Sequence, residues 1–346
     1  MKARAASLLL ALACGSASEG AAPPDAAASN GRPCAASGTS GCIYTTLPSS
    51  ATCDAGVLAP EWQARALAQV NRIRLIAGVP EIPLAQEASS ALQACTLVNA
   101  LLEATNSDPP KTAACWSEAA RNACRESNLT TLGFRVPSSV PDTVFRSLQG
   151  PEVFVDSWLL DDAPGPTPEA PSLGHRRWLL DPFLGPTAFA MSFSLSEDAE
   201  GPLVRQVGAL RVITTPPTEA IVLERDVVAW PIDEVPAALV APDGWLLASI
   251  VVSVTEPGDN AVVDFSRASV RISAAGADVP IALGADGLPD LRYTGAGKGP
   301  VHGLANHLQW RTAAPLSAST DYSVVIDGIA GQGAPESVSY TFRITP

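Results

Sequence analysis

The stretch Val153–Leu195 reads VFVDSWLLDDAPGPTPEAPSLGHRRWLLDPFLGPTAFAMSFSL and decides more about the fold than any other part of the chain. It begins with apolar residues, continues into the carboxylates Asp161 and Asp162, and then enters a Pro-rich loop. His175 follows, one of only three histidines in the chain. Large and small residues then alternate over Thr187–Leu195, which is typical of a strand. We therefore expect a helix, a loop and a strand, with His175 at the entrance to the strand.

Helical patterns dominate the chain upstream of this stretch. Apolar residues recur every three to five positions after Pro60, a residue that is tolerated at the start of a helix. Gly78 and Pro80 are expected to end that helix. Helices are predicted within residues 61–77, 84–102 and 113–125 and around residues 151–160.

Strands dominate the chain downstream. They are expected at residues 187–195 and 204–213, and after residues 214–217 the pattern changes to strands only. Clear alternation covers residues 250–254, 268–272, 322–326 and 338–344. The fold class is therefore α+β, with a second, all-β domain over residues 216–346 whose short strands suit an immunoglobulin-like sandwich.

The first residues indicate export. Lys2 and Arg4 precede a nine-residue apolar stretch, Ala5–Ala13, which fits a secretory signal and is too short to span a bilayer. The sequence LALAC that ends at Cys14 resembles a bacterial lipoprotein box. We expect a signal peptide over residues 1–13, acylation of Cys14 and anchoring to a membrane. The alternative is ordinary secretion after cleavage further downstream.

The other cysteines favour disulfides. Residues 14–60 are rich in Ala, Ser and Pro, and we predict a tether there. We expect one bridge within Cys34–Cys53 and one or two within Cys95–Cys124, because the cysteine spacing does not match that of zinc ligands. Disulfides imply an extracytoplasmic, oxidising compartment. The cysteines concerned are Cys34, Cys42, Cys53, Cys95, Cys115 and Cys124.

The charge of the chain excludes one class of partner. The formal net charge is −13, which repels nucleic acid, and the longest basic run is Arg176-Arg177. No motif for a nucleophile elbow or a zinc protease is present, so we assign no catalytic residue and expect no cofactor.

Two stretches resemble a known family. Residues 66–102 read ALAQVNRIRLIAGVPEIPLAQEASSALQACTLVNALL and resemble the opening helices of bacterial members of the CAP superfamily, which includes the cysteine-rich secretory proteins. Residues 174–182, GHRRWLLDP, resemble the Gly-His motif of that superfamily. The resemblance covers about residues 61–213. It implies a CAP/SCP-like α-β-α sandwich over residues 61–215.

The resemblance also implies a cleft, lined in many members by two histidines and two acidic residues. His175 matches the histidine of the Gly-His motif, and Asp161 stands where one acidic residue is expected. Ser107 occupies the place of the other histidine, and Ser127 that of the second acidic residue, although Glu126 is adjacent. One histidine and one aspartate are a poor site for a divalent ion, so we expect no metal.

Each candidate has a plain structural alternative. His175 lines a cleft with Asp161 orienting its ring, or it is a buried histidine bonded to a backbone carbonyl. Asp161 and Asp162 serve the site, or they stand at a solvated helix end, or they form ion pairs with Arg176-Arg177. Ser107 or Ser127 converges with His175 as a nucleophile with its base only if the fold supplies the geometry.

We therefore expect an exported, lipid-anchored envelope protein whose cleft binds a lipid, a peptide or a glycan without catalysis. The alternative is a hydrolase that acts on peptide or cell-wall bonds through His175. A third possibility is a purely structural envelope protein whose cleft is filled by its own side chains.

Overall fold

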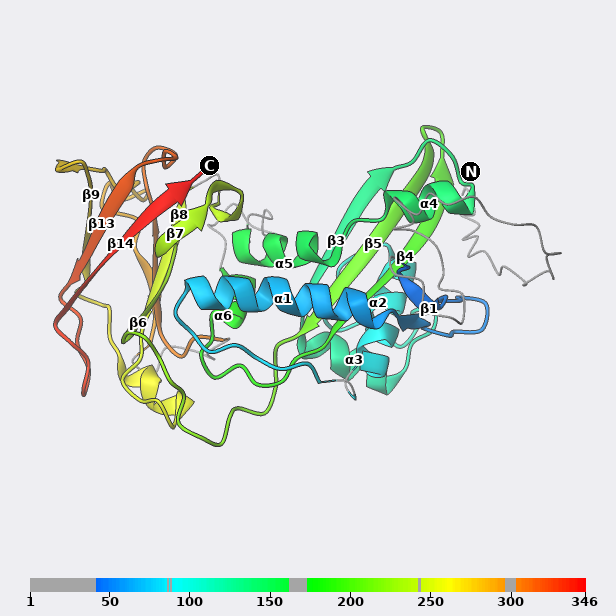
Figure 1. The fold of residues 1–346 in the computed structure, drawn as a ribbon, viewed down its shortest axis with the longest axis horizontal. Helices are drawn as coiled ribbons and strands as arrows, with labels where there is room; N and C mark the ends of the chain where they lie inside the picture. Colours follow the sequence, from blue (N-terminus) through cyan, green and yellow to red (C-terminus); the bar gives the residue numbers. More distant parts are fainter. Residues whose placement is uncertain (1–41, 86, 88, 162–172, 242–243, 296–302) are drawn as a thin grey trace, which may run out of the picture. The chain divides into compact units, whose positions relative to one another are not determined.

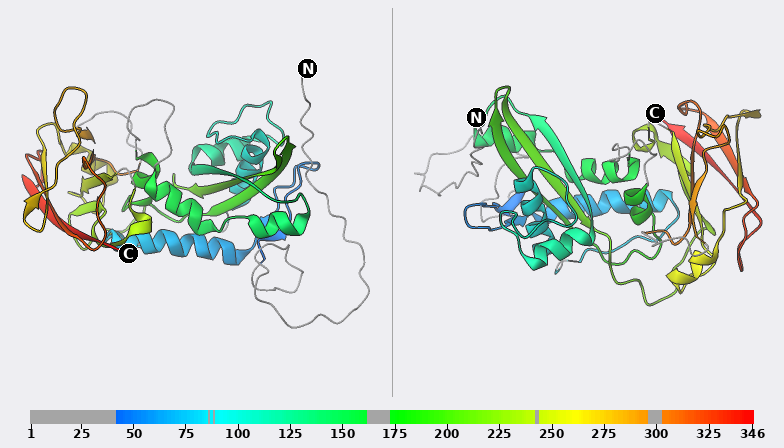
Figure 2. Two further views of the ribbon diagram at one scale, coloured as in Figure 1. Left: turned by 90° about the horizontal axis from the view of Figure 1, so that it is seen from above. Right: turned by 180° about the vertical axis from the view of Figure 1, so that it is seen from behind.

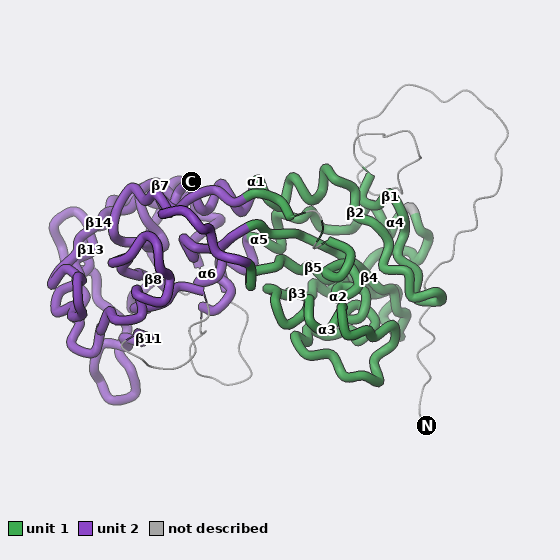
Figure 3. Tube along the Cα trace, turned by 90° about the horizontal axis from the view of Figure 1, so that it is seen from below, with its two compact units in different colours: residues 1–68, 83–155, 186–214 green, residues 69–82, 156–185, 215–346 purple. Residues whose placement is uncertain are grey.

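The computed structural model describes residues 42–85, 87, 89–161, 173–241, 244–295 and 303–346. The predicted signal peptide, Cys14, Cys34 and Asp162 lie outside these residues. The chain divides into two compact units (Figure 3). The first unit contains residues 1–68, 83–155 and 186–214, and the second contains residues 69–82, 156–185 and 215–346.

Most helices were expected from the sequence. Pro60 begins α1, and Gly78, with a φ of +71°, follows its end. The hydroxyl of Ser117 accepts a hydrogen bond from Ala120 N and so caps α3. The helices are α1 (Pro60–Ile76), α2 (Ser89–Leu102), α3 (Glu118–Arg125), α4 (Pro141–Ser147), α5 (Pro151–Leu160) and α6 (Gly174–Leu179), with 3₁₀ turns η2 (Ala237–Leu239) and η3 (Pro257–Val262).

Two of these helices correct the expectations. The helix predicted from residue 84 is α2, which begins only at Ser89, because Leu84 instead forms a parallel bridge with Thr187. His175 does not stand at the entrance to a strand but lies in the first turn of α6. α4 was not anticipated from the sequence.

An antiparallel sheet forms the centre of the first unit. Its strands are β3 (Ser127–Arg135), β4 (Phe189–Asp198) and β5 (Gly201–Arg211), in the order β3-β5-β4. They lie side by side in Figure 1. β3 was not predicted, because its residues TTLGFR show no regular apolar alternation.

The two faces of this sheet are packed differently. On one face, the small side chains of Ala190 and Ala209 let α2 approach, and Leu92 and Cys95 pack there. On the other face, Phe154 of α5 covers Gly208, where an added Cβ atom would overlap the Phe154 ring. The sheet therefore has helical residues on both faces.

The segment predicted as a tether is folded from Cys42 onward. It forms the antiparallel pair β1 (Tyr44–Thr46) and β2 (Val57–Leu58). Tyr44 is fully buried, and its hydroxyl donates to Met191 O at 3.0 Å. This residue attaches the segment to the sheet of the first unit.

Disulfides join distant parts of the first unit. Cys95 of α2 pairs with Cys124 of α3, as expected for the segment between them. Cys53 does not pair within its own segment but with Cys115, 62 residues away, which corrects that expectation for Cys53. Cys42 is also disulfide-bonded. Such bridges are typical of proteins that fold in an oxidising, extracytoplasmic compartment.

The second unit is mostly β-structure in two sheets. One has the order β10-β9-β13-β14-β7 and the other β11-β12-β8-β6, and every pairing is antiparallel except that of β14 with β7. Figure 2 shows the orange and red strands of the C-terminal part next to one another from both directions. The strands are β6 (Val227–Trp230), β7 (Asp233–Pro236), β8 (Trp245–Ile250), β9 (Ser269–Ala274), β10 (Ala277–Asp278), β11 (Arg292–Thr294), β12 (His307–Arg311), β13 (Asp321–Asp327) and β14 (Ser337–Thr345).

Both sheets contribute to one apolar core. Trp310 and Leu246 of the four-stranded sheet belong to the same buried cluster as Val324 and Phe342 of the five-stranded sheet. The alternation predicted at residues 322–326 and 338–344 therefore reflects one face turned to a core and one to solvent.

One predicted strand ends early. Alternation was expected over residues 250–254, but β8 stops at Ile250. The backbone N–H groups of Val252 and Ser253 donate to Asn260 Oδ1 at 2.7 and 2.9 Å, so a side chain replaces the sheet as their partner. Within the described residues, none of the helices combines the length and apolar character needed to cross a bilayer.

Candidate functional site

The carboxylate of Asp161 positions His175 from fourteen residues away. Asp161 Oδ2 accepts a hydrogen bond from His175 N at 3.0 Å, and a longer contact of 3.5 Å joins it to Arg176 N. Asp161 Oδ1 accepts from His175 Nδ1 at 3.1 Å. The residue before α6, Leu173, provides no side-chain cap. Asp161 therefore acts as the N-terminal cap of α6 and orients the imidazole at the same time.

The two partners differ in their access to solvent. The side chain of His175 is 38% exposed, whereas that of Asp161 is 11% exposed. A carboxylate only accepts hydrogen bonds, so the contact at Nδ1 requires the imidazole proton on Nδ1. A shielded acid thus holds a solvent-accessible imidazole in one tautomer and one orientation.

Arg176 attaches the start of α6 to its surroundings within the second unit. Its guanidinium is fully buried and donates to three carbonyl groups, those of Leu159 at 2.6 Å, Leu160 at 2.8 Å and Trp245 at 2.9 Å. Leu159 and Leu160 are the last residues of α5, where carbonyl groups lack helical partners and favour a cation. Arg176 therefore joins α6, the end of α5 and β8.

Arg74 stabilises the other end of α6 in the same way. This buried side chain donates from Nη1 to Leu179 O and Asp181 O, both at 2.8 Å, and from Nε to Pro80 O at 2.7 Å. Burial lowers the pKa of Arg74 to about 10, and the charge of Asp181 opposes that shift. Burial also raises the pKa of Asp181 to about 6.

Arg177 links α6 to β12. Its Nη1 lies 3.5 Å from His307 Nδ1, which also receives a hydrogen bond from the Thr294 hydroxyl at 2.7 Å. Burial, and then the charge of Arg177, lower the pKa of His307 to about 3. His307 is therefore a neutral acceptor, which leaves His175 as the histidine of the described chain whose ring is open to solvent and held by a carboxylate.

The other candidates belong to the first unit. The Ser127 hydroxyl donates to Ala123 O at 2.6 Å, and the Glu126 carboxylate forms an ion pair with Arg211 at 3.1 Å. Ser107 is exposed. The contacts of Ser127 and Glu126 are those of residues that end α3 and hold β5, and neither contact prepares a nucleophile or a base.

In the described part of the chain, no group of three or more His, Cys, Asp or Glu side chains is placed to hold a metal ion. For the alternative in which Asp161 forms an ion pair with Arg176-Arg177, the guanidinium of Arg176 donates to three carbonyl groups. Burial lowers the pKa of Arg177, and the charge of Asp161 opposes that shift.

Sequence reasoning missed the buried arginines, because two adjacent arginines ordinarily indicate a surface. The signal was their position in GHRRWLL, between apolar residues on both sides. No protein-family model matches this chain, and a search of curated proteins finds none that matches it.

Proposed function

We propose that this chain is an exported, lipid-anchored cell-envelope protein of the CAP type that binds a lipid, peptide or glycan ligand at His175 without catalysis. The observation that carries the proposal is the Asp161–His175 pair, with its shielded carboxylate and exposed imidazole. An imidazole fixed in one orientation recognises a polar ligand group at low entropic cost, because its rotamer is set before binding.

Two features of the fold support the CAP assignment. The three-stranded antiparallel sheet with helical residues on both faces is what an α-β-α sandwich requires. The histidine of the GHRRW segment meets the aspartate that follows the Trp158 helix, as the resemblance implies. The two-sheet core of residues 227–344 supports an immunoglobulin-like sandwich in the C-terminal part of the chain.

The hydrogen bond of Ser127 and the ion pair of Glu126 favour binding over hydrolysis. A serine nucleophile needs its hydroxyl proton directed to a base, and the Ser127 hydroxyl directs it to a backbone carbonyl. The Glu126 carboxylate is already paired with Arg211.

Native mass spectrometry of the purified full-length chain tests the proposal. We expect wild-type protein to carry a bound mass that is lost from His175→Ala and from His175→Phe. Arg271→Ala, an exposed change on β9, is the matched control and should retain the bound mass. Wild-type protein without a bound mass, or a His175→Ala variant that keeps it, would contradict the proposal. Multiple-turnover hydrolysis of the extracted ligand that His175→Ala abolishes would support the hydrolase instead.

The anchor has its own test. Cells that express the chain are fed an alkyne-tagged fatty acid, and label is expected on wild-type protein and on Cys34→Ser but not on Cys14→Ser. Equal labelling of wild-type protein and Cys14→Ser would exclude lipidation at Cys14.

A further inference from the structure

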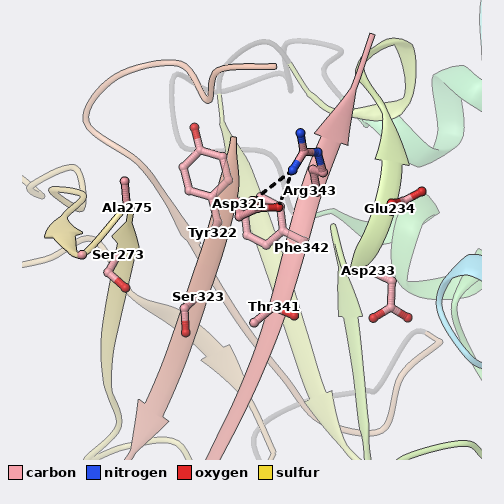
Figure 4. A pocket seen from close by; sticks show the side chains of 11 residues that line it. Asp233, Glu234, Ser273, Ala275, Asp321, Tyr322, Ser323, Thr341, Phe342 and Arg343 are labelled. Carbon is pink, nitrogen blue, oxygen red and sulfur yellow. Dashed lines mark hydrogen bonds and ion pairs between the residues drawn. The ribbon is translucent and has the colours of Figure 1, made fainter. Parts of the chain in front are cut away.

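A groove lies on the solvent-facing side of the five-stranded sheet in the second unit. Its volume is about 620 Å³, and residues of β7, β9, β13 and β14 line it (Figure 4). Tyr322 and Val324 of β13 are buried in the core, so the residues that alternate with them face outward. The groove therefore lies on the face of the five-stranded sheet that points away from the apolar core.

Three hydroxyl groups form a row across the floor of this groove. Ser323 of β13 is paired in register with Ser273 of β9 and with Thr341 of β14. Residues directly opposite one another on neighbouring strands project on the same side of a sheet, about 5 Å apart. Figure 4 shows the three side chains next to one another.

These hydroxyls have no hydrogen-bond partner among the residues that the structure describes. Each one both donates and accepts, so the row offers alternating donors and acceptors to a molecule lying across the strands. At the edge of the groove Ala275 has a small side chain and Gly276 has none, so the row stays accessible. A Cβ atom added at Gly276 would meet no atom within 4 Å.

The charged residues of the rim are largely neutralised by partners of their own. Asp321 pairs with Arg343 through both carboxylate oxygens at 3.0 Å, and Asp233 pairs with Arg225 at 2.6 Å. Glu234 adds one further carboxylate. The groove therefore has an uncharged floor, whose hydroxyls can form hydrogen bonds with a ligand, and a slightly acidic rim.

We propose that this groove binds an uncharged glycan, at a site separate from His175. Each sugar hydroxyl can both donate and accept a hydrogen bond, and so can the hydroxyls of Ser273, Ser323 and Thr341. Rim carboxylates accept hydrogen bonds from hydroxyl groups strongly. The net charge of −13 and the acidic rim disfavour acidic glycans.

Isothermal titration of the full-length chain tests this site with four probes: cellohexaose, laminarihexaose, chitohexaose and hexagalacturonate. We expect at least one of the three neutral hexasaccharides to bind and hexagalacturonate not to bind. The double variant Ser323→Ala/Thr341→Val should weaken binding by about tenfold or more, since each lost hydrogen bond costs several-fold.

The matched control is Ser269→Ala/Ser339→Ala, which alters hydroxyls on the same face of β9 and β14 outside the groove. This control should bind like wild type. In a His175→Ala background the Ser323→Ala/Thr341→Val change should still weaken binding of the hexasaccharide about tenfold, which separates this site from the proposed function. Binding of none of the neutral probes, equal binding of hexagalacturonate, or equal loss in the control would overturn the proposal. Thermal unfolding verifies that both double variants are folded.

Discussion

The two units of this protein are stabilised by different interactions. The cysteines that the structure describes all belong to the first unit, where Cys53–Cys115 and Cys95–Cys124 join segments far apart in sequence. The second unit contains no cysteine, but it holds the buried arginines of the described chain, namely Arg74, Arg176 and Arg177.

The difference matters because disulfides and buried arginines affect different states of the chain, the unfolded state and the folded state. A disulfide acts mainly by limiting the freedom of the unfolded chain. A buried guanidinium acts in the folded state, where it provides hydrogen bonds to carbonyl groups that water no longer reaches. The first unit should therefore respond to reductant, and the second to pH and to single substitutions.

The largest effect is expected from Arg176→Met. This change keeps much of the side-chain volume but leaves three buried carbonyl groups without their donor, so the free energy of unfolding of the second unit should fall by about 3–5 kcal/mol. Denaturant unfolding followed by hydrogen exchange of α5 and β8 measures it.

Arg271→Met is the control for that change. Arg271 is 72% exposed and lies 3.3 Å from Asp327, so its loss should change the free energy of unfolding by less than about 0.5 kcal/mol. Similar losses in the two variants would mean that the buried guanidinium has no special role.

Loss of a disulfide should lower the stability of the first unit but not that of the second. Removing Cys53–Cys115, which spans 62 residues, through Cys53→Ala/Cys115→Ala is expected to destabilise the first unit by about 2–4 kcal/mol. Hydrogen exchange of β3 and β5 should rise, while that of β12 and β13 should not. Faster exchange in β13 after this change would show that the stability of the two units is coupled.

The smallest of the three effects concerns pH and His307. Its pKa is about 3 in the folded state, below the ordinary value, so the unfolded chain takes up a proton first as the pH falls. The stabilisation is complete above about pH 6.5 and declines by about 1.4 kcal/mol per pH unit below it, or about 2 kcal/mol by pH 5.

His307→Asn keeps an acceptor near the position of Nδ1 but does not titrate. The difference in unfolding free energy between wild type and this variant should therefore change with pH between 6.5 and 5, whereas parallel profiles would contradict the burial of a neutral His307.

Local signals in the sequence predicted much of the fold. Pro60 and Gly78 bound α1, and the alternation in residues 322–326 and 338–344 matches β13 and β14. These features depend on residues that are close along the chain, which a single sequence displays directly.

What the sequence did not reveal depends on residues far apart. The cap of α6 comes from Asp161, the partner of Cys53 is Cys115, and β8 ends because Asn260 takes over its neighbours' hydrogen bonds. The pairing of His175 with Asp161 was anticipated only through the resemblance to the CAP superfamily. The burial of Arg176 was missed, because two adjacent arginines ordinarily indicate a solvent-exposed surface.

Nitrogen-15 NMR of the His175 ring, recorded at a pH where the imidazole is neutral, tests the central claim that Asp161 fixes this group for ligand recognition. We predict the tautomer protonated on Nδ1 in the wild-type protein and a mixture of tautomers in Asp161→Ala. A His175 ring protonated on Nε2, or one whose signals are unchanged in Asp161→Ala, would contradict the claim.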